Sequence, residues 1–150
     1  MSKVTAKSRA LTDFRKALLP VFEAHGFSLS TGKYVRSNGS VTQQIHPRKH
    51  LDLDDRFFIE WNMELTVVEG DQKFRSFLQF LEGREVFDSV MMAPYGPAEV
   101  EAAVRWHTYR LQKHVFVVAD RLIDPLHALA YDDELRARIE DGVNLLIYRD

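Results

Sequence analysis

The sequence predicts an α+β fold: an N-terminal helix, an antiparallel sheet of at least three strands, and a mostly helical C-terminal half packed on one sheet face. The first observation behind this prediction is the segment 57–67, where apolar and polar residues alternate. The second is the helical spacing of apolar residues in two segments, 5–25 and 97–125. Because side chains alternate between the two faces of a strand, segment 57–67 presents one apolar and one polar face. We expect the helices to cover the apolar face, leaving the polar face to water or to a partner.

Length and composition indicate one folded domain over residues 1–150. With 45% hydrophobic residues, a chain of 150 residues can bury about 70% of its unfolded surface. The absence of cysteine excludes disulfides, thiol catalysis and Cys-based metal sites, and it fits a reducing compartment. No apolar run reaches the ~18 residues of a membrane-spanning helix, and no secretory signal is present. We therefore expect a cytoplasmic protein that does not enter a membrane.

The net charge of −2 conceals an uneven distribution of charged residues. Residues 1–50 hold nine Lys and Arg against two acidic residues, whereas residues 51–150 hold 11 against 20. A basic segment of this kind can bind an acidic partner. The basic residues are dispersed along the chain, so we favour packing of the N-terminal helix near the acidic C-terminal half.

The first helix is expected over residues 5–25. Pro20 should kink it or join two shorter helices, because proline removes a backbone donor. Gly26 is suited to the left-handed conformation that ends a helix, and Phe27 can then fold back on the last turn. The apolar stripe of this helix consists of Leu11, Phe14, Leu18, Val21 and Phe22.

A hairpin and a long strand follow the helix. The hairpin strands are expected at 33–36 and 40–46, on either side of a turn at Asn38-Gly39. Pro47 should stop the second strand and leave residues 46–55 as a polar loop. At about 3.3 Å per residue, segment 57–67 would span about 36 Å, so we expect this strand to bend or to carry a bulge.

In the second half of the chain, the sequence pattern leaves two segments open between helix and strand. Gly70-Asp71 ends the long strand, and residues 74–81 suit either a short helix closed by Gly83 or a strand. Residues 91–96 are expected to form a loop before a long helix from Pro97 to Pro125. Asp132 should cap a final helix, and residues 143–148 suit either a helix or a strand. The stripe of the long helix consists of Val100, Val104, His107, Leu111, Val115, Val118 and Leu122.

The polar face of the sheet is the best candidate for a functional site. Glu60, Asn62 and Glu64 share one face, and neighbouring members lie about 7 Å apart along the strand. Thr42, Gln44 and His46 share one face of the preceding strand, and strand pairing would bring the two sets side by side. Two carboxylates can divide acid and base roles, so Glu60 and Glu64, with His46, are the weak catalytic candidates. The simpler interpretation is a solvated face of cross-strand polar pairs.

Motifs for metals, cofactors and phosphate cradles are missing from the sequence. His107 and His114 are seven residues apart, about 10.5 Å along a helix, which is too far for one metal ion without other ligands. We expect His107 to be a hydrogen-bonded core residue, and we expect neither a metal nor a cofactor. The glycines form neither a dinucleotide-binding motif nor a P-loop, and no nucleophile motif is present. A pI near 6.3 and an acidic sheet face make nucleic acid an unfavourable partner.

The order of features resembles an uncharacterised bacterial family of unknown function. Its members open with a helix that runs into Gly-Phe, here residues 14–27. A short aromatic-bearing strand (34–36), a Gln-containing strand (41–45) and a long alternating strand follow. The resemblance covers residues 11–67 and extends to 122–126, where such proteins have a helix broken by proline. It implies the fold described above and no catalytic residues.

These observations lead us to expect a non-enzymatic interaction module, set in a bacterial conflict or stress system. Its partner would be a protein, bound by the polar face or by the segment 46–55 at its edge, and a homo-oligomer remains open. The alternative is a small hydrolase that uses the paired carboxylates. The expected partner-binding residues are Gln44, His46, Arg48, Glu60, Asn62 and Glu64.

Overall fold

The computed structural model describes residues 5–50, 52–80, 90–124 and 145–149. Helices and strands follow the α+β order expected from the sequence, with one helix before the sheet and a long helical segment after its main strands. In chain order the elements are α1 (Ala6–Glu23), β1 (Ser28–Ser30), β2 (Lys33–Asn38), β3 (Val41–His50), β4 (Arg56–Glu69), β5 (Gln72–Phe80), β6 (Val90–Met92), α2 (Pro97–Arg110), the π-helical turn η2 (Leu111–Val115), α3 (Phe116–Leu122) and β7 (Leu145–Arg149).

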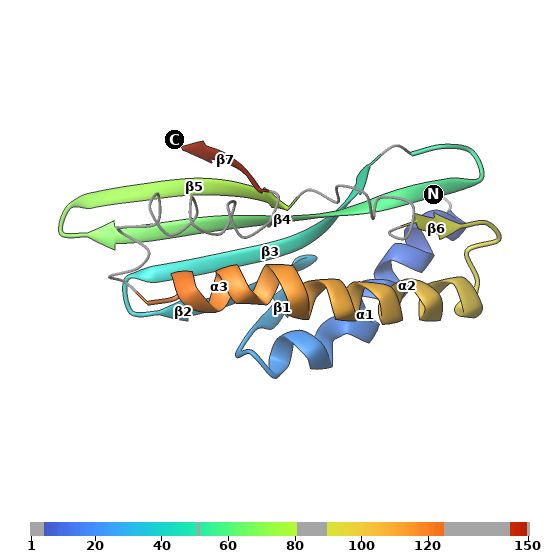
Figure 1. The fold of residues 1–150 in the computed structure, drawn as a ribbon, viewed down its shortest axis with the longest axis horizontal. Helices are drawn as coiled ribbons and strands as arrows, with labels where there is room; N and C mark the ends of the chain where they lie inside the picture. Colours follow the sequence, from blue (N-terminus) through green and yellow to red (C-terminus); the bar gives the residue numbers. More distant parts are fainter. Residues whose placement is uncertain (1–4, 51, 81–89, 125–144, 150) are drawn as a thin grey trace.

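The described strands form one antiparallel sheet (Figure 1). Its order is β1-β2-β3-β4-β5-β7, and β6 pairs with the first residues of β4. The longest ladder joins β3 to β4, from Val41 opposite Val67 to His50 opposite Phe58. Strand β4 has 14 residues, so one strand forms the spine on which the shorter strands pair.

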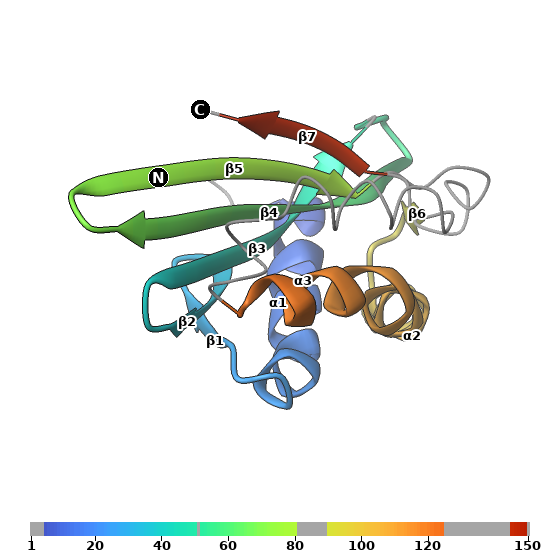
Figure 2. The same ribbon diagram turned by 60° about the vertical axis from the view of Figure 1, so that its left-hand side comes forward.

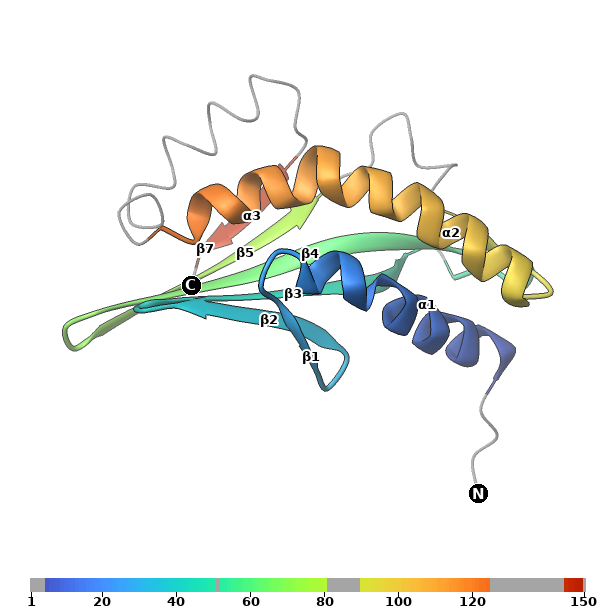
Figure 3. The same ribbon diagram turned by 90° about the horizontal axis from the view of Figure 1, so that it is seen from below.

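The helices lie on one side of this sheet (Figure 2), and α2, η2 and α3 run as one continuous rod along it (Figure 3). Side chains at the odd positions of β4 point to the helices and are buried, from Phe57 to Val67. The even positions point to the other face. This two-layer arrangement confirms the α+β class and the helical layer on the apolar face.

Local signals explain where α1 begins and ends. The hydroxyl of Thr5 caps the helix by accepting a hydrogen bond from the Ser8 amide at 3.1 Å. Pro20 lies within the helix. After the helix, Gly26 adopts a φ of +85°, and the Phe27 amide donates to the Phe22 carbonyl. The Phe27 ring then packs edge-on against Phe22, as the sequence predicted.

An aromatic cluster joins the helices to the sheet. The ring of Phe22 stacks on Tyr34 of β2, with 3.7 Å between ring centroids, and meets Phe116 of α3 edge-on at 5.0 Å. Trp61 of β4 donates its indole N–H to Nδ1 of His107 on α2 at 3.0 Å. His107 is fully buried, so the expectation of a hydrogen-bonded core histidine is confirmed.

Polar contacts also connect the basic first third to the later helices. The side chain of Gln43, buried on the helical side of β3, accepts from Arg36 and donates to the Ala119 carbonyl at 2.7 Å. Asp120 of α3 pairs with Arg36 at 2.8 Å and with His25 at 3.0 Å. Helix α1 also contacts α2, so the N-terminal helix packs against the C-terminal half as the charge distribution suggested.

The predicted end of β3 was wrong. Pro47 does not stop the strand, which continues to His50 and turns the first part of the expected loop into sheet. Strand β2 begins at Lys33 and pairs only as far as Ile45, so beyond it β3 has β4 as its one described neighbour on this sheet. Proline is tolerated on such an edge, because no strand there needs its missing N–H.

Other predictions are resolved by strand pairing. Residues 72–80 form β5 and not a helix, and the first two residues of the expected loop at 91–96 belong to β6 (Val90–Met92). The ambiguous segment 143–148 contributes strand β7 from residue 145. The hairpin turn is Gly39-Ser40, with a φ of +60° at Gly39, one residue later than Asn38-Gly39. The expected helix after Asp132, Gly83 and the resemblance at 125–126 lie outside the described residues.

We predict that Phe22→Ala lowers the free energy of unfolding by about 3–5 kcal/mol, because it empties the centre of the aromatic cluster. Urea denaturation followed by tryptophan fluorescence measures the change. Lys16→Ala on the exposed side of the same helix is the control and should change stability by less than about 0.5 kcal/mol. A loss below about 1 kcal/mol for Phe22→Ala would contradict the central place of this ring.

Candidate functional site

Strand pairing places the predicted site residues in two adjacent rows. Residues directly opposite one another in an antiparallel pair point to the same face. The structure therefore brings the polar set of β3 alongside the polar set of β4, as expected. We call these eight residues the polar sheet face: Thr42 opposite Thr66, Gln44 opposite Glu64, His46 opposite Asn62, and Arg48 opposite Glu60.

Most of the polar sheet face is accessible, but Glu60 is not. Arg48 is exposed, and Gln44, Asn62 and Glu64 are half-buried. Only 7% of the surface of Glu60 is exposed to solvent. Glu60 is thus the least accessible member of the polar sheet face, and Arg48 is the most accessible.

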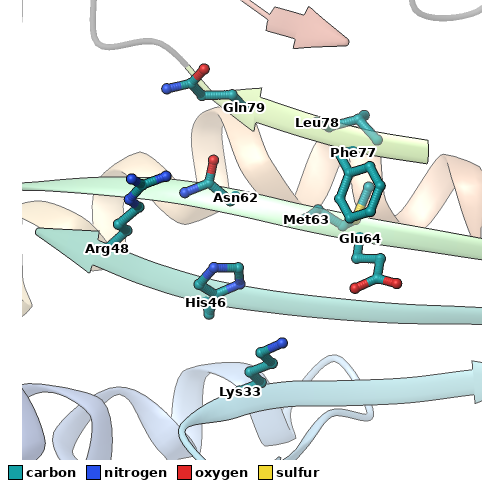
Figure 4. A pocket seen from close by; sticks show the side chains of 9 residues that line it. All are labelled: Lys33, His46, Arg48, Asn62, Met63, Glu64, Phe77, Leu78 and Gln79. Carbon is teal, nitrogen blue, oxygen red and sulfur yellow. The ribbon is translucent and has the colours of Figure 1, made fainter. Parts of the chain in front are cut away.

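A depression of about 370 Å³ opens in the middle of the polar sheet face. Four neighbouring strands, β2 to β5, contribute to its walls, and Figure 4 shows their side chains around His46. The aromatic ring of Phe77 forms an apolar wall beside them. The polar side chains in the lining are Lys33, His46, Arg48, Asn62, Glu64 and Gln79.

The negative charge in the depression is already offset. Glu64 accepts hydrogen bonds from Nε and Nη2 of Arg75, at 3.0 and 2.9 Å. The Arg75 guanidinium also lies 5.3 Å from the centre of the Phe77 ring. Cross-strand pairing thus holds Glu64 and Arg75 together at one side of the depression.

The positive charges of the depression are not offset in this way. Lys33 and Arg48 lie in the lining, and neither forms a hydrogen bond or ion pair with another residue in the described part of the chain. A third cation, Arg15 of α1, lies close to Gly32, where an added Cβ would be 3.9 Å from its guanidinium carbon. The depression therefore carries positive charge that its own residues leave available.

Two polar atoms beside these cations lack partners. Nδ1 of His46 and Nδ2 of Asn62 are buried, and no described residue forms a hydrogen bond with either atom. The two residues are directly opposite in the β3–β4 ladder. Buried polar groups in native proteins are nearly always hydrogen-bonded, so this pair marks a place where a ligand or water would be held.

The charges around His46 keep its ring neutral. Burial lowers the pKa of His46 below its usual value, and the positive charges of Lys33, Arg15 and Arg48 lower it further, while Glu64 acts in the opposite direction. At neutral pH the ring is thus an uncharged group with one donor and one acceptor nitrogen.

The two carboxylates of the hydrolase alternative do not meet in this depression. Glu64 lines it, whereas Glu60 is not among its lining residues. The two residues are four positions apart on β4, about 13 Å at 3.3 Å per residue, and paired glycosidase carboxylates lie about 5–10 Å apart. The geometry gives the hydrolase interpretation no support.

No arrangement suited to a metal ion is found among residues 5–50, 52–80, 90–124 and 145–149, where no three His, Asp or Glu side chains converge. His107 is committed to Trp61, and His25 is paired with Asp120.

The lining also contains residues that were not predicted as site residues, among them Lys33, Phe77 and Gln79. Lys33 could have been found from the alternation of 33–37, which places it on the same side as Val35 and Ser37. Phe77 and Gln79 could not, because segment 74–81 suited a helix and a strand equally, and only pairing with β4 decides their face. The convergence of dispersed basic residues likewise follows from the sheet order.

Comparison of the chain with protein-family models, with curated proteins and with solved structures found no match. The resemblance to an uncharacterised bacterial family therefore stays a prediction. Within the described residues, no helix is long and apolar enough to span a membrane.

We predict that acid destabilises the protein partly through His46. The folded pKa lies below the unfolded one, so between the two values the unfolded chain binds a proton that the folded chain does not. Stability from this residue is therefore complete above about pH 6.5 and falls as the pH drops towards the folded pKa.

Urea denaturation of wild type and His46→Gln between pH 7.5 and 5 tests this prediction. The free energy of unfolding should fall more steeply on acidification in the wild type, and the other histidines serve as a common background. Equal slopes would show that folding does not lower the pKa of His46.

Proposed function

We propose that this protein is a non-enzymatic interaction module that binds a protein partner through the polar sheet face. One observation carries the proposal: the described helices cover only one side of the sheet, while the other side presents half-buried polar residues around a depression. Glu64 is paired with Arg75, whereas Lys33 and Arg48 of the lining have no hydrogen-bond or ion-pair partner among the described residues. This charge is what we propose a partner would meet.

The proposed contact set omits one residue of the sequence-based set and adds three others. Gln44, His46, Arg48, Asn62 and Glu64 lie on the accessible part of the face, so they stay in the proposal. Glu60 is buried, so it is left out of the proposed set. Lys33, Phe77 and Gln79 join the set because they line the depression.

Charge and size indicate the kind of partner. The positive charges of Lys33 and Arg48 favour a partner with an acidic surface. Complementary charge speeds association and fixes the orientation in which the partner docks. Four strands at ~4.8 Å spacing, over about 20 Å of strand, give a platform of roughly 400 Å². This is about half of what a standard interface buries on each partner, so the complex belongs to the small, transient class.

Charge reversal on the polar sheet face tests the proposal. Wild-type protein, Arg48→Glu and Arg105→Glu are immobilised, and proteins retained from the native host are measured by quantitative mass spectrometry. Arg105 is the matched control, because its side chain is 76% exposed on helix α2 and the same charge change there leaves the face intact.

We expect wild type and Arg105→Glu each to retain one host protein in stoichiometric amount. The amount that Arg48→Glu retains should be at least about tenfold lower, because a charged contact is lost. Two results would contradict the proposal: equal retention by Arg48→Glu, which would exclude this face, and no stoichiometric protein on wild type.

A further inference from the structure

The depression combines features that a partner's flat surface would not need. Lys33 and Arg48 approach it from β2 and β3, and Figure 4 shows them on either side of the His46 ring. The unpartnered Nδ1 of His46 and Nδ2 of Asn62 lie in the same place. Two cations and two polar nitrogens without hydrogen-bond partners among the described residues surround one depression. Such groups can bind an anion that has several oxygen atoms.

We propose that the depression binds the phosphate group of a small organic phosphate monoester, held between Lys33 and Arg48 above His46 and Asn62. This inference assigns a ligand to the polar sheet face. It rests on the proposed function, because it requires that face to be a binding surface. The phosphate can belong to a free small molecule or to a side chain of the protein partner, and the chemistry of recognition is the same.

Charge and donor number favour a phosphate monoester over a carboxylate. A phosphate monoester carries about −1.5 to −2 charges at pH 7 and three acceptor oxygens, whereas a carboxylate carries one charge and two oxygens. The lining supplies Lys33 and Arg48, which have no ion-pair partner in the described part of the chain, and the Asn62 amide as a further donor. The single anionic side chain of the lining, Glu64, is neutralised by Arg75 and so opposes the phosphate only weakly.

The wall opposite the cations indicates that the ligand has an apolar part. The half-buried Phe77 ring and the Gln79 amide line the depression on the β5 side. A volume of about 370 Å³ exceeds the need of a phosphate alone and lies at the lower end of ligand pockets, about 300–1,000 Å³. An aromatic or similarly flat group on the phosphate would rest against Phe77.

His46 reports on occupancy. The charged groups that face it are Lys33 from β2, Arg15 from α1, Arg48 from β3 and Glu64 from β4. A phosphate between the cations would screen their effect and favour the charged imidazole, so ligand binding raises the pKa of His46. A merely structural histidine would not respond.

Isothermal titration calorimetry with phenyl phosphate, inorganic phosphate and phenylacetate tests the ligand class. We expect phenyl phosphate to bind tightest, about tenfold or more tighter than phenylacetate. Lys33→Met and Arg48→Met should each weaken it about tenfold or more, since each removes a charge-assisted hydrogen bond. Lys73→Met is the matched control: Lys73 is exposed on β5, opposite Val68 and outside the depression, and its loss should change affinity less than twofold.

The pKa of the His46 ring, followed by NMR in the same samples, is the second readout. Saturating phenyl phosphate should raise it in wild type and in Lys73→Met, and circular dichroism verifies that each variant is folded. The inference is overturned by equal binding of phenylacetate, by an equal effect of Lys73→Met, or by an unchanged His46 titration at saturation.

The source of the phosphate is assigned by phosphatase treatment of the host proteins before capture on the immobilised protein. Loss of the retained partner assigns the phosphate to the partner, and unchanged retention assigns it to a free molecule. Failures of the two proposals are distinguishable: phenyl phosphate binding without any retained protein overturns the protein-binding role alone, and a retained protein without phenyl phosphate binding overturns the phosphate site alone.

Discussion

The arrangement of the whole molecule depends on the packing of one strand, β4, against the helices. Trp61 is fully buried on its apolar side and is fixed by a hydrogen bond to His107 of α2 and by rings of α1 and β2 around it. Since a shift of one residue would exchange the two faces of a strand, this packing also fixes which side chains of β4 point away from the helices. Strand β4 pairs with β3 and β5, so its register also fixes which of their side chains point away from the helices. The buried packing of β4 therefore determines the positions of the residues in the polar sheet face.

This constraint explains how charges that are scattered in the sequence meet in space. Lys33 and Arg48 belong to two different strands, and antiparallel pairing places both in the lining of a single depression. Arg75 of a third strand pairs with Glu64, whereas Lys33 and Arg48 have no such partner among the described residues. Burial lowers the pKa of His46 most, and the positive charges of Lys33, Arg15 and Arg48 lower it further. Positive charge at this face therefore contributes both to the electrostatics of His46 and to the proposed binding.

Alternation and helix spacing were sufficient to predict the fold class, the N-terminal helix, the long helix after Pro97 and the two faces of β4, because these depend on local periodicity. Strand β5 and the extension of β3 through Pro47 were not predicted, because both depend on which neighbour a strand has. For the site, the facing sets of β3 and β4 were found from alternation alone. The burial of Glu60, the Glu64–Arg75 pair and the contribution of Phe77 required the sheet order, and they support our proposed anion site over the alternative of paired carboxylates.

The most direct test of this account is backbone amide NMR of the whole chain during titration with phenyl phosphate. The account predicts that the largest shifts lie on β2 to β5 around His46 and Asn62, with little change on the exposed side of α2. Shifts that gather on the helices, or that spread evenly over the basic residues of the first third, would contradict the proposal that the polar sheet face is the binding surface.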